Sequence, residues 1–182
     1  EHEKADGVRI YVDTVDATGN QNLQNDQIVQ FLERNFDVLC VNMVDRTAAG
    51  SIIDKAKQAN VPVVFFNREP VAEDMQRWDK LYYVCSLASE SGVLEGNIVV
   101  DAYRAQPERW DKNGDGKLQY VLLEGEPGHQ DSLIRTEVTI KTITDAGIPL
   151  EKLDGDTADW QRAQAGVMMA QWLETYGDEI EL

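Results

Sequence analysis

Short apolar runs alternate with stretches of helical periodicity along the chain, and this alternation constrains the fold more than any other feature of the sequence. Five runs rich in Val, Ile and aromatic residues are typical of buried strands: VRIYV, FDVLCVNMV, VPVVFF, KLYYVC and LQYVLL. Other apolar residues recur at helical spacing, as in Ile28, Phe31 and Leu32. Strands that alternate with helices in this way predict an α/β fold of βαβ units, with parallel sheets covered on both faces.

The composition narrows the classes of partner that such a fold would bind. The 182 residues carry a net charge of -16, which disfavours nucleic acid and anionic membrane surfaces as partners. No apolar run approaches the length of a membrane-spanning helix, so a membrane-spanning protein is not expected. Cys40 and Cys85 are the only cysteines, and two cysteines imply no disulfide framework.

A segment of small and polar residues, CSLASESG, follows the fourth strand-like run and marks the expected boundary between two lobes. We therefore predict a partial N-terminal lobe over residues 1–85, a hinge crossing over residues 86–92, and a partial C-terminal lobe over residues 93–182.

Polar side chains gather where two predicted strands end. Asn67 ends VPVVFFN, and YVLLEGEPGHQD leads into His129 and Asp131, with Arg135 one helical turn further on. Ligands of open parallel sheets bind beyond the carboxyl ends of the strands, so these residues favour a binding cleft between lobes. Each residue also has a local alternative, in which Asp131 caps the helix, Arg135 pairs with Asp131, and Asn67 forms a turn.

Trp160, in DTADWQRAQAG, supplies an aromatic group for the same site. We expect it in the first turn of a helix capped by Thr157 or Asp159, where its ring can project past the helix end. A flat ring beside Asp, Asn and Arg suits a pyranose, whose C–H faces stack on the ring while its hydroxyls bind the polar groups. Core packing is the alternative for Trp160 and the expected role of Trp172.

The segment DKNGDGKLQ has the spacing of the first half of an EF-hand calcium loop, with Asp111, Asn113 and Asp115 followed by Gly116. The second half is missing, because the twelfth loop position, where an EF-hand has glutamate, is Leu122. The alternative is a solvated acidic turn that uses its glycines for tight backbone angles.

Long segments of the chain resemble the periplasmic galactose/glucose-binding proteins of bacterial ABC importers and sugar chemotaxis. The segments that carry the resemblance are QNDQI, VNMVDRTAAG, NVPVVFFNREP, YYV, SESG, DKNGDGKLQYVLLEGEPGH and the spacing DTADW. The resemblance implies two Rossmann-like lobes of the periplasmic binding protein type I fold, with the first hinge crossing near YYV. It also implies that the sugar-contacting positions are Asn67, His129, Asp131, Arg135 and Trp160.

The same resemblance implies a structural calcium ion whose loop is closed by a distant glutamate, which matches Glu181. The implied ligands are Asp111, Asn113, Asp115, Lys117 through its carbonyl, Gln119 and Glu181. Glu124 and Glu126 follow the strand toward the sugar end and are not expected to close the loop. Family members extend beyond both ends of this chain, so the resemblance implies that the fold is incomplete at both ends.

The function that follows from the resemblance is non-enzymatic binding of D-galactose or D-glucose for ABC import and chemotaxis. The implied partners are a monosaccharide, an ABC permease and a chemoreceptor, and the implied location is the periplasm or the cell surface. Two alternatives remain: the sugar-sensing core of a LacI-type regulator, and a small α/β enzyme that uses His129 and Asp131 as base and orienting acid. The regulator would need a basic headpiece, and the sequence contains no GxSxG or GxGxxG motif for the enzyme.

Overall fold

The structure is a computed structural model that describes Gly7 and residues 9–182, and it divides into two compact units, Glu1–Cys85 and Ser86–Leu182. The elements of the first unit are α2 (Gln21–Glu33), β1 (Leu39–Val41), η1 (Arg46–Ala48), α3 (Ala49–Ala59), β2 (Val63–Phe66), α4 (Ala72–Met75) and β3 (Leu81–Val84). The elements of the second unit are α5 (Ala88–Ala105), α6 (Pro107–Trp110), β4 (Leu118–Glu124), α7 (Gln130–Asp145), β5 (Leu150–Thr157), α8 (Arg162–Tyr176) and η2 (Gly177–Glu179).

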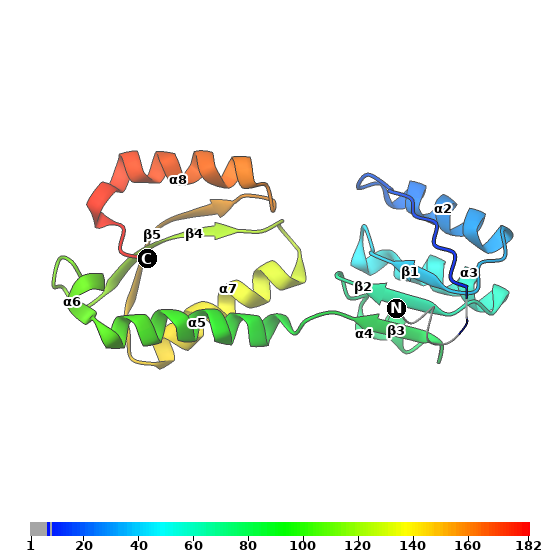
Figure 1. Cartoon of the computed structure of the whole chain (residues 1–182), viewed down its shortest axis with the longest axis horizontal. Helices are drawn as coiled ribbons and strands as arrows, with labels where there is room; N and C mark the ends of the chain where they lie inside the picture. The colour runs from blue at the N-terminus through cyan, green and yellow to red at the C-terminus, as the bar shows by residue number, and fades with distance from the viewer. Residues whose placement is uncertain (1–6, 8) are drawn as a thin grey trace. The chain divides into compact units, whose positions relative to one another are not determined.

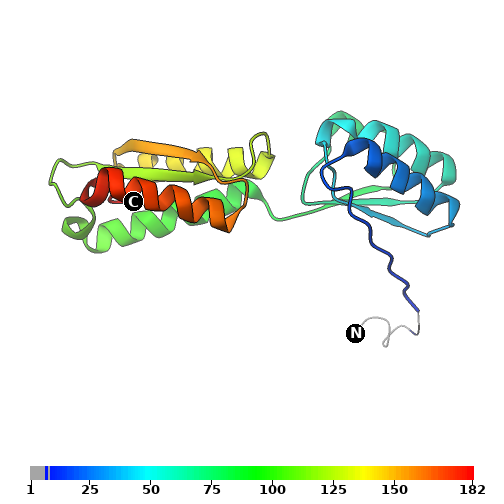
Figure 2. The same ribbon diagram turned by 90° about the horizontal axis from the view of Figure 1, so that it is seen from above.

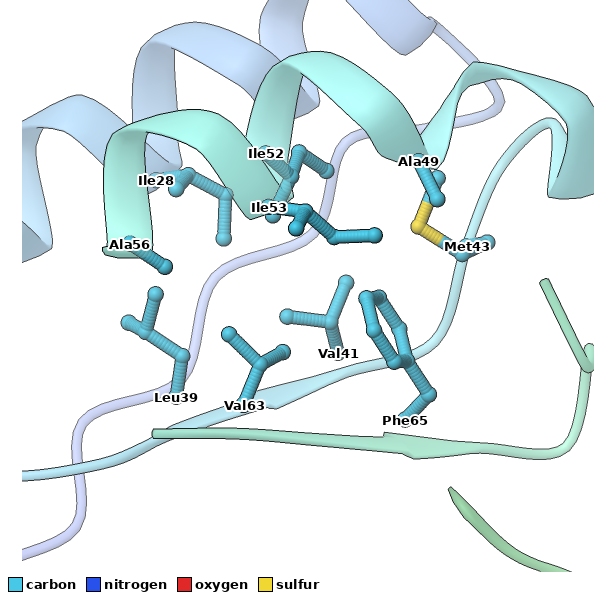
Figure 3. Close-up of a cluster of buried hydrophobic side chains, with 10 residues drawn as sticks. All are labelled: Ile28, Leu39, Val41, Met43, Ala49, Ile52, Ile53, Ala56, Val63 and Phe65. Atoms are coloured by element: carbon cyan, nitrogen blue, oxygen red, sulfur yellow. The ribbon is translucent and has the colours of Figure 1, made fainter. Parts of the chain in front are cut away.

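The first unit is built on a parallel sheet of order β1-β2-β3, and α2 and α3 lie side by side on one of its faces (Figure 2). Figure 3 shows the core between them, where Ile52 and Ile53 of α3 meet Val41, Val63 and Phe65 of the strands. Burial of these apolar side chains supplies the main driving force for the folding of the unit. The predicted α/β class and parallel pairing are confirmed here.

The opposite face of this sheet is not covered as the sequence predicted. Within the part of the chain that the structure describes, Phe66 is 42% exposed, Tyr82 52% and Val84 63%. Alternate residues of a strand point to opposite faces, so packing α2 and α3 on one face leaves these three side chains on the other. The prediction of helices on both faces is therefore wrong for this unit.

The first predicted strand, VRIYV, is also wrong as far as it is described; Val8 lies outside the described residues. Residues 9–12 belong to neither sheet, and Figure 2 draws them without a strand arrow. The Tyr11 ring instead stacks on Phe36 with 6.1 Å between centroids, and Asp13 pairs with Arg34 at 2.7 Å. An apolar run becomes a strand only where a neighbouring strand accepts its hydrogen bonds, and this segment packs near the end of α2 instead.

The second unit is a two-stranded parallel sheet, β4-β5, with α5 and α7 on one face and α8 on the other (Figure 1). The register aligns Glu124 with Thr157, so both strands end at the same edge. Strand β5 was not predicted, because its sequence LEKLDGDT is acidic and has neither an apolar run nor regular alternation. The buried core consists of Val100, Leu118, Ile143 and Ile148.

Helices α5 and α7 approach each other closely through two glycines. A Cβ on Gly92 would lie 2.8 Å from the Cβ of Val138, and one on Gly96 would lie 2.6 Å from the Cβ of Thr142. Both distances are shorter than van der Waals contact, so only glycine permits this spacing of the two helices. The helices predicted from apolar spacing form here, but that spacing does not mark a buried face, because Leu94 is 59% exposed and Ile98 70%.

The segment predicted as a hinge lies at the start of the second unit. Residues 86 and 87 have no regular structure, and residues 88–92 are the beginning of α5. The hinge function of this segment stays a prediction. No helix among the described residues combines the length and the apolar character needed to cross a membrane.

Candidate functional site

Two asparagines stand at the carboxyl ends of β1 and β2 in the first unit. Asn67 directly follows β2 and has a left-handed backbone, with φ at 62°, a conformation that asparagine tolerates better than most residues. Its Nδ2 donates a hydrogen bond to Oδ1 of Asn42, 3.3 Å away, and the Tyr83 hydroxyl donates to its carbonyl oxygen at 2.9 Å. Asn67 is therefore held by its neighbours, and among the described residues its own Oδ1 accepts no hydrogen bond and can accept one from a ligand.

Asn42 is a candidate site residue that the sequence analysis missed. It follows β1 as Asn67 follows β2, so the repeated pattern of a strand ending in Asn was the signal that could have found it. Its backbone carbonyl also accepts a hydrogen bond at 2.7 Å from Nε2 of Gln24, a nearly buried residue of α2. The polar groups at the ends of both strands are thus tied to the covering helix.

His129 in the second unit is the N-cap of α7, and it is 6% exposed. Its Nδ1 accepts a hydrogen bond from the backbone N–H of Asp131 at 3.2 Å. A neutral imidazole whose Nδ1 accepts must carry its hydrogen on Nε2, so the ring can donate one hydrogen bond to a ligand from that atom. The alternative in which Asp131 caps this helix is wrong, because His129 occupies the capping position.

Trp160 lies beside His129 but not in a helix. It belongs to the turn between β5 and α8, which begins at Arg162, and its φ is 60° after an equally unusual 48° at Asp159. The predicted position in the first helical turn is therefore wrong, and the N-cap of α8 is Gln161 rather than Thr157 or Asp159. The ring meets the His129 ring edge to face with 5.7 Å between centroids, and the residue remains 54% exposed.

Arg135 and Asp131 both lie on α7, one helical turn apart, but they do not pair. Nη2 of Arg135 instead lies 3.4 Å from Oε2 of Glu95 on α5, in an ion pair that is about half exposed on both sides. Among the described residues, the Asp131 carboxylate makes no hydrogen bond or ion pair, so its oxygens remain able to accept from a ligand. The alternative of a local Asp131–Arg135 pair is wrong.

A cavity of about 100 Å³ connects part of this set within the second unit. Its lining includes Trp160, Arg135, Glu95 and Gly125, which come from the turn before α8, from α7, from α5 and from the end of β4. Four of the five predicted sugar-contacting residues therefore belong to the second unit: His129 and Trp160 are in contact, Asp131 follows His129, and Arg135 lines the same cavity as Trp160. The fifth, Asn67, belongs to the first unit.

The predicted calcium loop is a compact network of oxygen groups at the opposite end of β4. Both carboxylate oxygens of Asp111 accept backbone hydrogen bonds, from Asp115 at 3.1 Å and from Gly116 at 2.9 Å. Oδ1 of Asn113 accepts from the backbone of Asp115 at 2.8 Å, and the Gln119 amide donates to Asp115 at 2.8 Å. These contacts hold the predicted side-chain ligands of the loop near one another.

Lys117 contributes only its backbone to this network. Its N–H donates to Oδ1 of Asp115 at 2.9 Å, whereas its ammonium group reaches out to Glu151, also at 2.9 Å. The hydrogen bond that its ammonium group donates to Glu151 raises the pKa of Lys117, so the side chain stays charged and is held by Glu151. The backbone carbonyl is therefore the only group by which Lys117 could serve a cation.

Glu181 lies against this loop although it is 62 residues beyond Gln119. Its Oε2 accepts from the backbone N–H of Gln119 at 3.2 Å, and its Oε1 accepts from Lys112 at 2.5 Å and from Asn113 at 3.4 Å. Only 7% of Glu181 is exposed. Of the acidic residues considered from the sequence, Glu181 contacts the loop, whereas Glu124 ends β4 at the far side of the strand.

Whether these residues fit a calcium ion depends on their donor chemistry. Within the described residues, no three carboxylate, imidazole or thiolate groups are arranged to hold a metal ion by themselves. The loop offers a mixed set, in which three carboxylates are joined by two side-chain amides and a backbone carbonyl. Hard oxygen groups of these kinds are the ligands that calcium takes, so the donor set fits calcium in kind.

Comparison with known proteins identifies the class to which this fold and site belong. Residues 1–182 match the family described as periplasmic binding protein domain, and the chain belongs to that family. Periplasmic sugar-binding proteins of this family are non-enzymatic transport components, which disfavours the enzyme alternative that used His129 and Asp131. The expected periplasmic binding protein type I fold is thereby confirmed.

Two curated relatives are similar in sequence. The D-galactose/methyl-galactoside binding periplasmic protein MglB of Haemophilus influenzae is 41% identical over 160 residues, which are 88% of this chain and 48% of the relative. A putative rhizopine-binding protein of Rhizobium meliloti is 31% identical over 92% of this chain and 50% of the relative. The chain thus spans about half the length of these relatives.

Solved structures show the same fold at lower identity. An ABC transporter periplasmic solute binding protein from Actinobacillus succinogenes with bound D-allose has a TM-score of 0.76 at 18% identity, covering 95% of this chain and 57% of the other. A solute binding protein from Bacillus halodurans with bound myo-inositol has a TM-score of 0.73 at 25% identity, covering 96% and 55%. At such identities the likeness concerns the fold rather than the ligand.

Proposed function

We propose that this chain is the central part of a periplasmic protein that binds D-galactose or D-glucose and delivers it to an ABC permease. The observation that carries the proposal is Trp160, an aromatic ring that is fixed on one side by His129 and more than half exposed. A ring held in this way offers its free face to the C–H groups of a pyranose. The 41% identity to a D-galactose-binding relative supports a hexose as the ligand.

The polar residues of the proposed site complement the hydroxyl groups of a sugar. Nε2 of His129 donates, the Asp131 carboxylate accepts, and the Arg135 guanidinium donates in pairs. Asn67, in the first unit, stays a predicted sugar contact that offers an amide oxygen. Neutral sugars offer both donors and acceptors, so a set that mixes both kinds suits them better than it suits a charged ligand.

We further propose that the loop of Asp111 to Gln119 holds a structural calcium ion closed by Glu181. Asp111, Asn113, Asp115, Gln119 and Glu181 would give side-chain oxygens, and Lys117 would give its carbonyl. When bound, the ion would supply positive charge that offsets the mutual repulsion of three carboxylates. The residues of the chain would supply the cage and its link to β4.

The expected location is the periplasm or the cell surface, and a chemoreceptor is a further proposed partner.

The experiment that tests the sugar proposal needs both units completed. We define the completed protein as this chain joined to the flanking segments of the Haemophilus influenzae relative. Calorimetric titration with glucose, galactose, allose, arabinose and myo-inositol should give the tightest binding for galactose or glucose. Trp160→Ala should weaken that binding at least tenfold, which is about 1.4 kcal/mol. Tightest binding of myo-inositol, or unchanged affinity in Trp160→Ala, would contradict the proposed ligand or the proposed stacking role respectively.

A further inference from the structure

Trp160 owes its position to a strained turn and not to a helix. Asp159 and Trp160 are consecutive non-glycine residues in the left-handed region, with φ values of 48° and 60°. Side chains rarely adopt this backbone conformation, and it persists only where surrounding contacts hold it. The contacts that hold Trp160 therefore decide where its ring points.

The ring lies directly on Gly125, the residue that follows β4. A Cβ on Gly125 would lie 2.5 Å from Cε2 of the indole and closer still to Cζ2 and Cη2. These three atoms belong to the six-membered ring, and no Cβ atom fits at such distances. Gly125 does not have a positive φ, so the backbone conformation does not require glycine here. What requires it is the contact with Trp160.

Gly125 is itself fixed by two hydrogen bonds from different elements. Its N–H donates to Oγ of Ser132 in α7 at 3.0 Å, and its carbonyl accepts from Oγ1 of Thr157, the last residue of β5, at 2.5 Å. The next residue, Ala158, donates its backbone N–H to the carbonyl of Glu124 at 2.8 Å. The end of β4, the start of α7 and the turn that carries Trp160 are thus joined around the glycine.

We propose that Gly125 is a positioning residue that sets the height and tilt of the Trp160 ring presented to the sugar. The inference rests on the proposed function and deepens it, because it assigns part of the affinity for the hexose to a residue that need not contact the hexose. A side chain at position 125 would lift the ring away from the end of β4 and misalign it with a pyranose held by His129 and Arg135. Fixing a binding group in its productive orientation is a general source of affinity.

The test uses the 182-residue chain labelled with 5-fluorotryptophan, whose four tryptophans give separate fluorine NMR signals. The Trp160 signal is assigned from its loss in Trp160→Phe. Gly125→Ala should shift this signal and leave the other three in place. D-galactose affinity, followed by 15N NMR titration, should fall at least tenfold in Gly125→Ala. Gly166→Ala is the matched control, because a Cβ at Gly166 in α8 meets nothing within 4 Å, and it should change neither reading.

A double-mutant cycle separates positioning from a general loss of structure. Phenylalanine lacks the outer atoms of the indole that a Cβ at position 125 would meet, so Gly125→Ala should weaken galactose binding much less when Trp160 is already Phe. An equal loss in both backgrounds would overturn the inference, as would an unmoved Trp160 signal with unchanged affinity in Gly125→Ala. The proposed function fails by a different result, namely unchanged affinity in Trp160→Ala.

Discussion

Substitution of Glu181 by Gln is the most direct test of the proposed calcium cage, because this one buried carboxylate accepts three long-range hydrogen bonds from the loop. Its two oxygens accept from the backbone N–H groups of Lys112, Asn113 and Gln119. A glutamine side chain has one carbonyl oxygen and one NH2 group, and the NH2 group cannot accept a hydrogen bond. The substitution therefore removes an acceptor from at least one backbone donor and removes one negative charge from the loop.

Two free-energy terms follow, and calcium distinguishes them. A backbone N–H left without an acceptor in a site where Glu181 is 7% exposed should cost about 1–3 kcal/mol, with or without metal. An ion that binds only the folded state stabilises it by roughly 2.7 kcal/mol at 100 times its Kd. Glu181→Gln should thus destabilise the chelated protein by the first term, and should also abolish most of the second.

The assay is urea unfolding of the 182-residue chain in chelator and in saturating calcium, followed by circular dichroism. In the wild type, calcium should raise the free energy of unfolding by about 2.7 kcal/mol, which corresponds to a rise in Tm of roughly 5–11 °C for a chain of this size. Glu124→Gln and Glu179→Gln are the controls, since Glu124 ends β4 and Glu179 is exposed in η2, and both should keep the full calcium increment.

The reasoning is refuted if calcium leaves wild-type stability unchanged, because the loop then holds no metal. It is equally refuted if Glu124→Gln and Glu181→Gln lose the same calcium increment, since the cage would then be closed by the wrong residue. A loss in Glu181→Gln that is the same size in chelator and in calcium would mean that Glu181 only accepts backbone hydrogen bonds.

The remaining predictions concern the two tryptophans, the helix pair and the affinity of the chain. Trp172→Ala should lose about 3–5 kcal/mol of stability in denaturant unfolding, because Trp172 is 7% exposed. Trp160→Ala should lose under about 1 kcal/mol of stability and should reduce hexose affinity instead. The opposite pattern would exchange the roles of the two tryptophans. Gly96→Ala should lower the stability by about 1–3 kcal/mol, because a Cβ there would lie 2.6 Å from the Cβ of Thr142. Gly166→Ala, where a Cβ in α8 meets nothing within 4 Å, should raise the stability by about 0.5–1 kcal/mol. Equal effects of the two substitutions would show that close helix packing does not cause the loss at Gly96. In calorimetry, the 182-residue chain should bind galactose only in the millimolar range, near -4 kcal/mol, and the completed protein should bind it at least a thousandfold tighter. Micromolar binding by the 182-residue chain would contradict the expectation that the flanking segments supply much of the binding free energy.

The strands with branched apolar runs were predictable, and the reason is visible in the core. Val63 and Phe65 of β2 are fully buried beneath Ile52 and Ile53 of α3, so their composition reflects burial in a parallel sheet. Strand β5 was not predictable in the same way. Only part of it is shielded from solvent, and its sequence LEKLDGDT lacks the apolar pattern that burial imposes.

Pattern and position also diverge at the candidate site. The residue types of the sugar set followed from strand ends. The helix predicted to include Trp160 begins only at Arg162, because contacts with Gly125 and His129 hold Trp160 in a left-handed turn before it. Glu181 could not be found from spacing, since a contact across 62 residues depends on the tertiary fold. Only the resemblance to a known family pointed to it, and the structure brings it to the loop.

The geometry of β4 relates the two proposed sites to each other. The loop that would hold calcium leads into the strand at Leu118, and Gly125 follows its last residue, Glu124. Seven residues of extended chain span roughly 20 Å, too far for the ion to act on a sugar by direct contact. Backbone hydrogen bonds link the two sites instead: Glu181 accepts from the N–H of Gln119, and Val121 donates its N–H to the carbonyl of Leu182 at 3.1 Å. The segment that would close the calcium loop therefore also pairs with the first half of β4. An ion bound there would stabilise the strand on which Gly125 and Trp160 depend, and chelation should therefore lower the stability of the folded unit far more than the intrinsic affinity of the folded protein for sugar.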